Sequence, residues 1–315
     1  MTLIRRLAWI ALVLAFGQIV FGAIVRITGS GMGCGDHWPQ CAGYWLPPLE
    51  RPDLIIEVTH RYIAAALSLA IVTLTAVAFV RRQLPGVAGT GGVLRATLLA
   101  AALVVVAALF GAATVKMELT NKAVIVTHLV IAMTLLAVLL IVIERTRGRS
   151  IATAGVSPRT LRGAYAATSL VFVALVLGAL TAHLPGANTA CGGFPLCNGS
   201  FVPSAPVQHV QYAHRLVALL LLLHAVSFTL AVSRRGEAPV IAPARLTLAA
   251  IAAQIVVAAV LVERNLPLVL RSLHEAVGTL IWISAVWLTI RAQRHVPKSA
   301  TQPLAPTRAA AKVPA

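Results

Sequence analysis

The sequence predicts an all-α membrane protein with eight transmembrane helices, arranged as two pseudo-symmetric four-helix bundles. Three observations predict this fold: an extremely apolar composition, eight long apolar runs, and a set of motifs that occurs twice. Of the 315 residues, 59% are hydrophobic and only 11% are charged, whereas soluble domains average about 25% charged residues. A chain this apolar needs lipid as its solvent, because apolar runs of about 20 residues are typical of membrane-spanning helices.

The eight apolar runs follow one another along most of the chain. They cover residues 7–27, 58–80, 96–115, 123–143, 164–184, 208–232, 246–262 and 270–290. The first run is long enough to span and contains no clear cleavage site, so we expect a retained helix rather than a signal peptide. From about residue 292 the chain is rich in Pro, Ala and basic residues without apolar periodicity. This composition predicts a disordered cytoplasmic tail over 292–315.

Basic residues divide unevenly between the two sets of connecting segments. The N-terminus, the C-terminal tail and the loops 81–95, 144–162 and 233–245 hold 18 of the 26 Lys and Arg residues. The positive-inside rule places this set in the cytoplasm, so we expect a multi-pass protein of the plasma membrane (the cell membrane) with both termini cytoplasmic. The net charge of +17 therefore reports topology and contact with anionic lipid, and it gives little support to nucleic-acid binding.

All four cysteines fall in two matching segments on the predicted outer side. Residues 34–43 read CGDHWPQCAG and residues 191–199 read CGGFPLCNG. The outer side is oxidising in bacteria, where disulfides persist, and segments this short permit local pairing. We therefore predict the disulfides Cys34–Cys41 and Cys191–Cys197. The alternatives are a metal site or free thiols.

The repeat extends beyond the cysteines and defines two halves. EVTHR at 57–61 follows the first segment and QYAHR at 211–215 follows the second. The offset between the copies is 157 residues for the first cysteine, 156 for the second and 154 for the histidine of HR; a further histidine pair has an offset of 146. Each half, 1–145 and 160–291, is thus a four-helix unit. Both units start on the same side of the membrane, which is the pattern of a parallel repeat.

Four histidines are predicted at one depth in the outer leaflet, because all the even-numbered helices enter from the outer side. They are His60 and His128 in the first half and His214 and His274 in the second. Histidine inside a spanning helix is costly and indicates function, and two histidines on facing helices can hold a haem iron from both sides. The alternative is interfacial histidines with a hydrated end. His224 points to another face than His214 and is assigned no role.

Charged residues accompany the histidines. Arg61 and Arg215 directly follow the HR histidines, and a guanidinium suits the carboxylate of a haem propionate; the alternative is that each reaches to the interface. Glu57 shares a helix face with His60, whereas the second half has Gln211 at that place. This asymmetry indicates that one half stores a cofactor and the other performs chemistry. The alternative is a solvated Glu57 at a helix N-terminus.

At these motifs the chain resembles the haem A synthases of bacterial respiratory membranes, over roughly residues 5–290. The resemblance rests on ITGSGMGCGDHWPQC, EVTHR, THL at 127–129, CGGFPLCNG, AHR at 213–215 and LHEA at 273–276. That family oxidises the C8 methyl group of haem O to a formyl group, which gives haem A for terminal oxidases. The resemblance implies the same oxidoreductase activity on a CH group, haem O as the substrate, and haem O synthase (protohaem farnesyltransferase) as a partner.

The resemblance also implies roles for single residues. In the second half, His214 and His274 are then the ligands of a resident haem b, and Arg215 lies beside it. In the first half, His60 and His128 receive the haem substrate, with Arg61 beside them and Glu57 as the catalytic residue. The second loop departs from the family pattern, since it lacks the acidic residue after its first cysteine and LTAHLPG replaces VRITGSG. The sequence leaves the membrane electron carrier and the formation of a homo-oligomer open.

The residues are consistent with a mechanism of successive hydroxylations. Withdrawal of electrons from the substrate porphyrin leaves its methyl carbon open to attack by water, and Glu57 can take the proton or stabilise charge. A second round gives a geminal diol, which dehydrates to the aldehyde. The alternatives are a di-haem b-type cytochrome that relays electrons, a membrane thiol oxidase that uses the cysteine pairs, and a transporter with parallel repeats.

Overall fold

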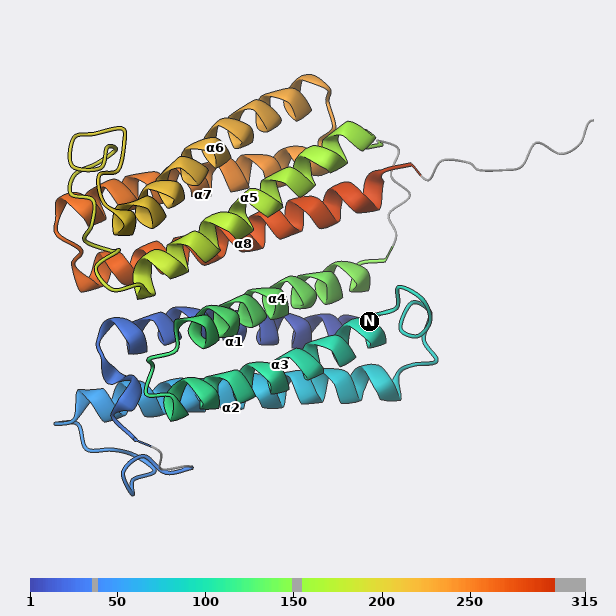
Figure 1. Cartoon of the computed structure of the whole chain (residues 1–315). Coiled ribbons are helices and arrows are strands. Elements are labelled where there is room, and N and C mark those ends of the chain that lie inside the picture. The colour runs from blue at the N-terminus through green and yellow to red at the C-terminus, as the bar shows by residue number, and fades with distance from the viewer. Residues whose placement is uncertain (36–38, 149–154, 298–315) are drawn as a thin grey trace, which may run out of the picture.

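The computed structural model describes residues 1–35, 39–148 and 155–297, and within these ranges it is built from eight long α-helices and one short 3-10 helix, without strands (Figure 1). The elements in chain order are α1 (Thr2–Ile27), η1 (Ser30–Met32), α2 (Pro52–Val80), α3 (Val93–Lys116), α4 (Lys122–Thr146), α5 (Pro158–His183), α6 (Pro206–Arg234), α7 (Ala238–Glu263) and α8 (Leu268–His295). All eight α-helices are long and apolar enough to cross a membrane. The predicted all-α membrane fold is confirmed.

Local sequence signals set several helix boundaries. Four helices, α2, α5, α6 and α7, have a proline in the first turn, where its missing N–H costs no hydrogen bond. The side chains of Asn121 and Ser157 cap α4 and α5 by accepting backbone N–H groups. At its far end α8 continues to His295, three residues past the expected start of the tail. Residues 298–315 of the predicted tail, and His37 of the first loop, lie outside the described residues.

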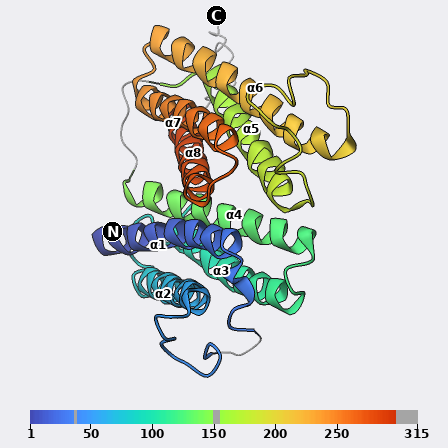
Figure 2. The same ribbon diagram turned by 90° about the vertical axis from the view of Figure 1, so that its left-hand side faces the viewer.

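Each half packs as a ring of four helices with the same order of neighbours. In the first half α1 and α3 each contact α2 and α4, and in the second half α5 and α7 each contact α6 and α8. The two rings lie side by side in both views, with α1 and α4 facing α8 and α5 (Figures 1 and 2). One cluster of buried apolar side chains extends across both rings. The same neighbour order in both halves is what the parallel repeat in the sequence predicts.

Polar contacts join the halves at both ends of their interface. At the end that carries the cysteine loops, the Arg26 guanidinium of α1 lies 3.8 Å from the Glu275 carboxylate of α8. At the opposite end, the buried Glu144 of α4 accepts from the Trp287 indole N–H and pairs with Arg294, both of α8. A buried carboxylate is costly unless it is paired. These contacts therefore favour one register of α8 against the first half.

Candidate functional site

The second half encloses a cavity of about 600 Å³ between α5, α6, α7 and α8. Its walls are mostly aliphatic, with Leu175, Leu222 and Ile251 among them. His214 from α6 and His274 from α8 both line it. A largely apolar cavity with a few polar groups is the usual form of a site for a small molecule or a cofactor. The structure thus brings together the two histidines that the sequence analysis assigned to one site.

The two imidazoles are spaced to hold one metal ion between them. The ring centres of His214 and His274 lie 6.4 Å apart, and their planes are inclined at 69°. Metal–imidazole bonds of about 2.0 Å on each side, plus about 1.1 Å from each nitrogen to its ring centre, add up to about 6.2 Å. The pair therefore fits a bis-histidine iron, which is a ligation that haem proteins use within helical bundles.

The His214 ring is held in the state that a metal ligand requires. Its Nδ1–H donates to the backbone carbonyl of Ala174 at 2.9 Å, and because a carbonyl only accepts, the proton is on Nδ1. Nε2 then keeps its lone pair, as in ligating imidazoles whose other nitrogen is hydrogen-bonded. Gly178 gives the ring its space, since a Cβ there would lie 3.1 Å from His214 Cε1.

The histidines of the first half have different surroundings. His60 Nε2 lies 2.8 Å from the side-chain amide nitrogen of Gln18 on α1, and a Cβ on Gly22 would lie 3.1 Å from the same Nε2. His128 faces Gly111 on α3, where a Cβ would lie 3.4 Å from His128 Cε1. In His214 the Nε2 atom has no protein partner within the described residues. In His60 the same atom is hydrogen-bonded to the Gln18 side chain.

Sequence reasoning missed Gln18, Gly22 and Gly178. The two glycines are separated by 156 residues, which is also the offset of the second cysteine of each loop, so the repeat contained a signal for them. At the same offset Gln18 corresponds to Ala174, whose carbonyl binds His214. Equivalent positions on α1 and α5 therefore bind the histidine of the HR motif. Gln18 binds His60 through its side chain, and Ala174 binds His214 through its backbone carbonyl.

Both cysteine loops are closed by disulfides. The S–S distance is 1.98 Å for Cys34–Cys41 and also for Cys191–Cys197. All four cysteines are buried, with at most 3% of their surface exposed. The structure therefore has the local pairing that the sequence predicts. Within the part of the chain that the structure describes, it has neither the metal site nor the free thiols that were the alternatives.

Glu57 and Gln211 hold the two loops in the same way. The backbone N–H of Cys34 donates to Glu57 Oε2 at 2.8 Å, and that of Cys191 donates to Gln211 Oε1 at 2.8 Å. Both side chains are buried, since Glu57 is 4% and Gln211 6% exposed. Glu57 is therefore not a solvated residue at the end of a helix. Its position at the base of the first disulfide loop was not expected from the sequence.

The two arginines contact the loops instead of extending into solvent. Arg61 Nη2 lies 2.6 Å from Glu57 Oε1 and donates to the backbone carbonyl of Gly35 in the first loop at 3.5 Å. Arg215 lines the cavity and donates to four backbone carbonyls of the second loop, those of Cys191, Gly193, Pro195 and Leu196. Each arginine thus anchors its own loop, and the contact of Arg61 and Arg215 with haem propionates stays a prediction.

Two further charged residues were missed because they come from distant parts of the chain. Arg26 of α1 and Glu275 of α8 both line the cavity of the second half, so the first half contributes a residue to this site. His224 does not line the cavity. Its ring N–H donates to the Gly163 carbonyl at 2.9 Å and the ring stacks on Phe228, which is consistent with the absence of an assigned role.

The fold and the site define a multi-pass helical membrane protein with a bis-histidine cavity in its second half. The model of the cytochrome oxidase assembly protein family (COX15-CtaA) matches residues 5–55 and 50–286. Similar proteins include the haem A synthases of Alkalihalophilus pseudofirmus (32% identical over 232 residues, 70% of this chain and 74% of the relative) and of Shouchella clausii (26% over 289 residues, 89% and 94%). The chain belongs to this family, the haem A synthase family of cytochrome oxidase assembly proteins.

Proposed function

We propose that the protein is a haem A synthase that oxidises the C8 methyl group of haem O to a formyl group, which yields haem A for terminal oxidases. One observation carries the proposal, which is the contrast between the two histidine pairs. In the second half, His214 and His274 line a preformed cavity at a spacing that would suit one metal ion between them. In the first half, His60 is hydrogen-bonded to Gln18, which suits a molecule that binds and leaves.

The C-terminal half, 160–291, is the site of a resident haem b in this proposal, and His214 and His274 are its ligands. A haem b held by these two histidines would supply one-electron transfer rather than oxygen binding. The hydrogen bond from His214 to Ala174 orients the ligand ring before the cofactor arrives. Positive charge suited to two propionates comes from the lining residues Arg26, Arg215 and Arg271.

The N-terminal half, 1–145, receives haem O through His60 and His128, with Arg61 nearby. Binding of the substrate at His60 displaces the Gln18 amide from Nε2, and release of the product restores that hydrogen bond. A hydrogen bond of this kind contributes about 0.5–1.5 kcal/mol. Such a weak competitor lowers the affinity for substrate and product alike, which favours turnover at a site whose ligand would otherwise dissociate slowly.

Glu57 is the residue to which we assign proton transfer. In each of two rounds, water adds its oxygen to the methyl carbon, two electrons leave to a membrane electron carrier, and two protons are released; loss of water from the resulting diol gives the aldehyde. Arg61 and the N–H of Cys34 fix both oxygens of the Glu57 carboxylate. A carboxylate fixed in this way can accept a proton from the attacking water.

The topology belongs to the same proposal. We place the protein in the plasma membrane with both termini in the cytoplasm, because 18 of the 26 Lys and Arg residues belong to the terminal segments and loops assigned to that side. Both disulfide loops project from the opposite end, away from the N-terminus and the end of α8 (Figure 1). The buried position of all four cysteines also disfavours the thiol oxidase alternative, which has to expose a disulfide to substrate thiols.

The test is expression of the protein with and without haem O synthase, followed by extraction and chromatography of the haems. We expect a new formyl haem only when both proteins are present. The matched control is His60→Ala, which removes a substrate ligand and leaves the second half intact. If the parent protein leaves haem O unconverted while it binds haem b normally, the proposal is wrong and the di-haem cytochrome is favoured.

A further inference from the structure

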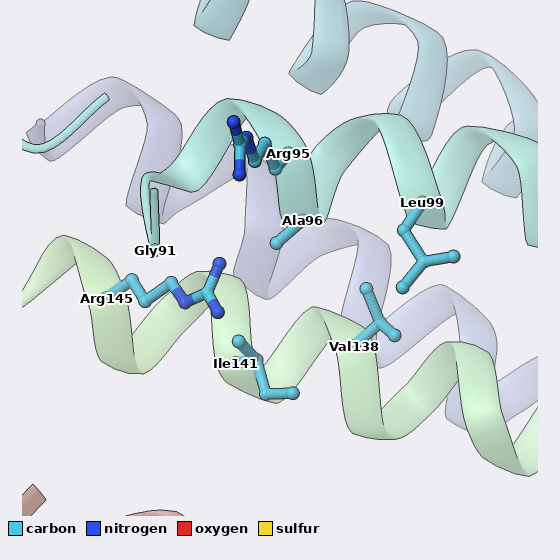
Figure 3. A pocket seen from close by; sticks show the side chains of 7 residues that line it. All are labelled: Gly91, Arg95, Ala96, Leu99, Val138, Ile141 and Arg145. Carbon is cyan, nitrogen blue, oxygen red and sulfur yellow. The ribbon is translucent and has the colours of Figure 1, made fainter. Parts of the chain in front are cut away.

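A second cavity, of about 310 Å³, lies in the first half at the end opposite to the histidines. It is formed between the start of α3 and the end of α4 by Gly91, Arg95, Ala96, Leu99, Val138, Ile141 and Arg145 (Figure 3). Arg145 is 17 residues beyond His128 on α4, which is about 26 Å along a helix. The cavity is therefore separate from both histidine pairs and has no part in the proposed reaction.

The polar end of this cavity carries positive charge only. Arg95 comes from α3 and Arg145 from α4, and no acidic residue is among the lining residues. The ion pairs within the described ranges also include neither of these two arginines. Two guanidinium groups at one cavity without a carboxylate suit a phosphate, which guanidinium binds through paired hydrogen bonds.

The backbone around the cavity positions Arg145. Its Nη1 donates to the Gly92 carbonyl at 2.9 Å. Gly91 has a φ of +80°, and a Cβ on Gly92 would lie 2.5 Å from the Val87 carbonyl oxygen, so this tight approach of the loop to α3 requires glycine. The hydrogen bond to Gly92 thus fixes the Arg145 side chain. The Arg95 side chain, in contrast, is exposed and can move toward a bound ligand.

The rest of the cavity is apolar and continues along the two helices. Leu99 lies one turn after Arg95 on α3, and Ile141 and Val138 lie one and two turns before Arg145 on α4 (Figure 3). Leu99 is 50% exposed in a helix that is apolar enough to face lipid. Basic groups at the membrane surface followed by an apolar groove match the two parts of a phospholipid.

We propose that this cavity binds an anionic phospholipid, with the headgroup phosphate between Arg95 and Arg145 and an acyl chain along Leu99, Val138 and Ile141. The binding site is independent of the proposed enzymatic function. It adds a lipid partner at the end of the protein that carries both the N-terminus and the end of α8.

The second half provides an internal comparison. At the histidine offset of 146 residues, Arg145 corresponds to Arg291, whose Nε donates to the Pro239 carbonyl at 3.4 Å, much as Arg145 donates to Gly92. On α7 the residues at the level of Arg95 are Ile241 and Ala242, and neither is charged. The arginine that fixes the loop is therefore repeated, and the second arginine that completes a phosphate site is present in the first half only.

The test is native mass spectrometry of the detergent-purified protein, titrated with phosphatidylglycerol and with phosphatidylcholine of the same chains. We expect one tightly held phosphatidylglycerol and at least about tenfold weaker binding of phosphatidylcholine. The variant Arg95→Ile gives α3 an apolar side chain, as α7 has at this level, and should weaken phosphatidylglycerol binding about tenfold, because a hydrogen bond to a charged group contributes about 1.5–3 kcal/mol. The control Arg245→Gln removes one exposed charge near the start of α7, at the same end of the protein but outside the cavity. It should leave binding unchanged.

Three results would overturn the proposal. They are equal binding of the two lipids, an Arg95→Ile variant that binds like the parent protein, and displacement of the lipid by glycerol 3-phosphate at equal concentration. The last result would show a phosphate site without an acyl groove. Thermal unfolding of Arg95→Ile without lipid should match the parent protein, since the Arg95 side chain is exposed.

Discussion

The two disulfide loops have the same frame but different electrostatics. In both loops a buried side chain from the following helix accepts the N–H of the first cysteine at 2.8 Å. In the first loop this side chain is Glu57 and it pairs with Arg61; in the second it is the neutral Gln211, and Arg215 binds backbone carbonyls instead. An amide is therefore sufficient to hold such a loop. The negative charge of Glu57 is not needed for the loop and is available for a second purpose.

The comparison of the histidine pairs predicts the largest effect. His214→Leu should abolish the retention of haem b, because it removes one of two ligands from a preformed cavity. His60→Leu should leave haem b in place, because His60 and its hydrogen-bond partner Gln18 both belong to the first half. Optical spectra of the purified variants distinguish the two results. Equal loss of haem b in both variants would contradict the assignment of different functions to the halves.

Glu57→Gln sharpens the comparison of the loops, because it gives the first loop the side chain of the second. The amide oxygen should still accept the Cys34 N–H, as Gln211 does for Cys191, so the fold and the bound haem b should persist. Conversion of haem O should fall about 10²–10⁴-fold if the carboxylate transfers protons. Haem chromatography measures this loss. Full conversion by the variant would limit Glu57 to its contact with the loop.

The reciprocal variant Gln211→Glu is the matched control. It should keep an acceptor for the Cys191 N–H and leave conversion close to that of the parent protein. A large loss of conversion in Gln211→Glu, with haem b retained, would show that both loops respond to charge. The chemistry would then not be confined to the first half.

Removal of one disulfide should have an intermediate effect. Closure of a loop of six or seven residues contributes about 2–3 kcal/mol through the entropy of the unfolded chain, with a separation of seven for Cys34–Cys41 and six for Cys191–Cys197. The double substitution of either pair by serine should lower the thermal unfolding temperature to a similar extent. Unequal losses would show that one loop is supported by other contacts, and the Arg215 carbonyl bonds of the second loop are the candidates.

The smallest effect is expected for Gln18→Leu. The change removes the hydrogen bond on His60 Nε2 and should tighten the binding of haem O roughly 2–10-fold, which corresponds to about 0.5–1.5 kcal/mol. Titration of haem O into the purified protein measures this affinity. Weaker binding would show that Gln18 supports the substrate rather than competing with it.

The sequence predicted the helices and both disulfides, but not the contacts around Glu57 and the four histidines. Eight helices followed from apolar runs, and His60, His128, His214 and His274 followed from a repeat that recurs at nearly constant offsets. The position of Glu57 under its loop could not be predicted, because Cys34 is 23 residues away across an irregular segment. Periodicity states which face of a helix a side chain occupies and not which neighbour it meets.

Other contacts lie still further beyond the reach of sequence pattern. Gln18 engages His60 from a different helix, 42 residues earlier in the chain. Arg215 resembles a residue that reaches to the membrane interface, yet four carbonyls of one loop fold back on it. Such contacts depend on the path of the loop. The composition of a short loop rich in Gly and Pro does not predict its backbone conformation.

The ion pair Arg26–Glu275 is a feature in which the two halves of the repeat differ. At the offsets of the repeat, Arg26 corresponds to Ala182 and Glu275 to Leu129, and both of these line the same cavity as the charged pair. The charged link therefore exists once, and an ancestor made of two identical chains would have had it twice or not at all. If the chain is split between α4 and α5 and the two fragments are coexpressed, the fragments should assemble with each other in preference to their own copies. The duplicated halves would then behave as two specialised subunits that share one polypeptide.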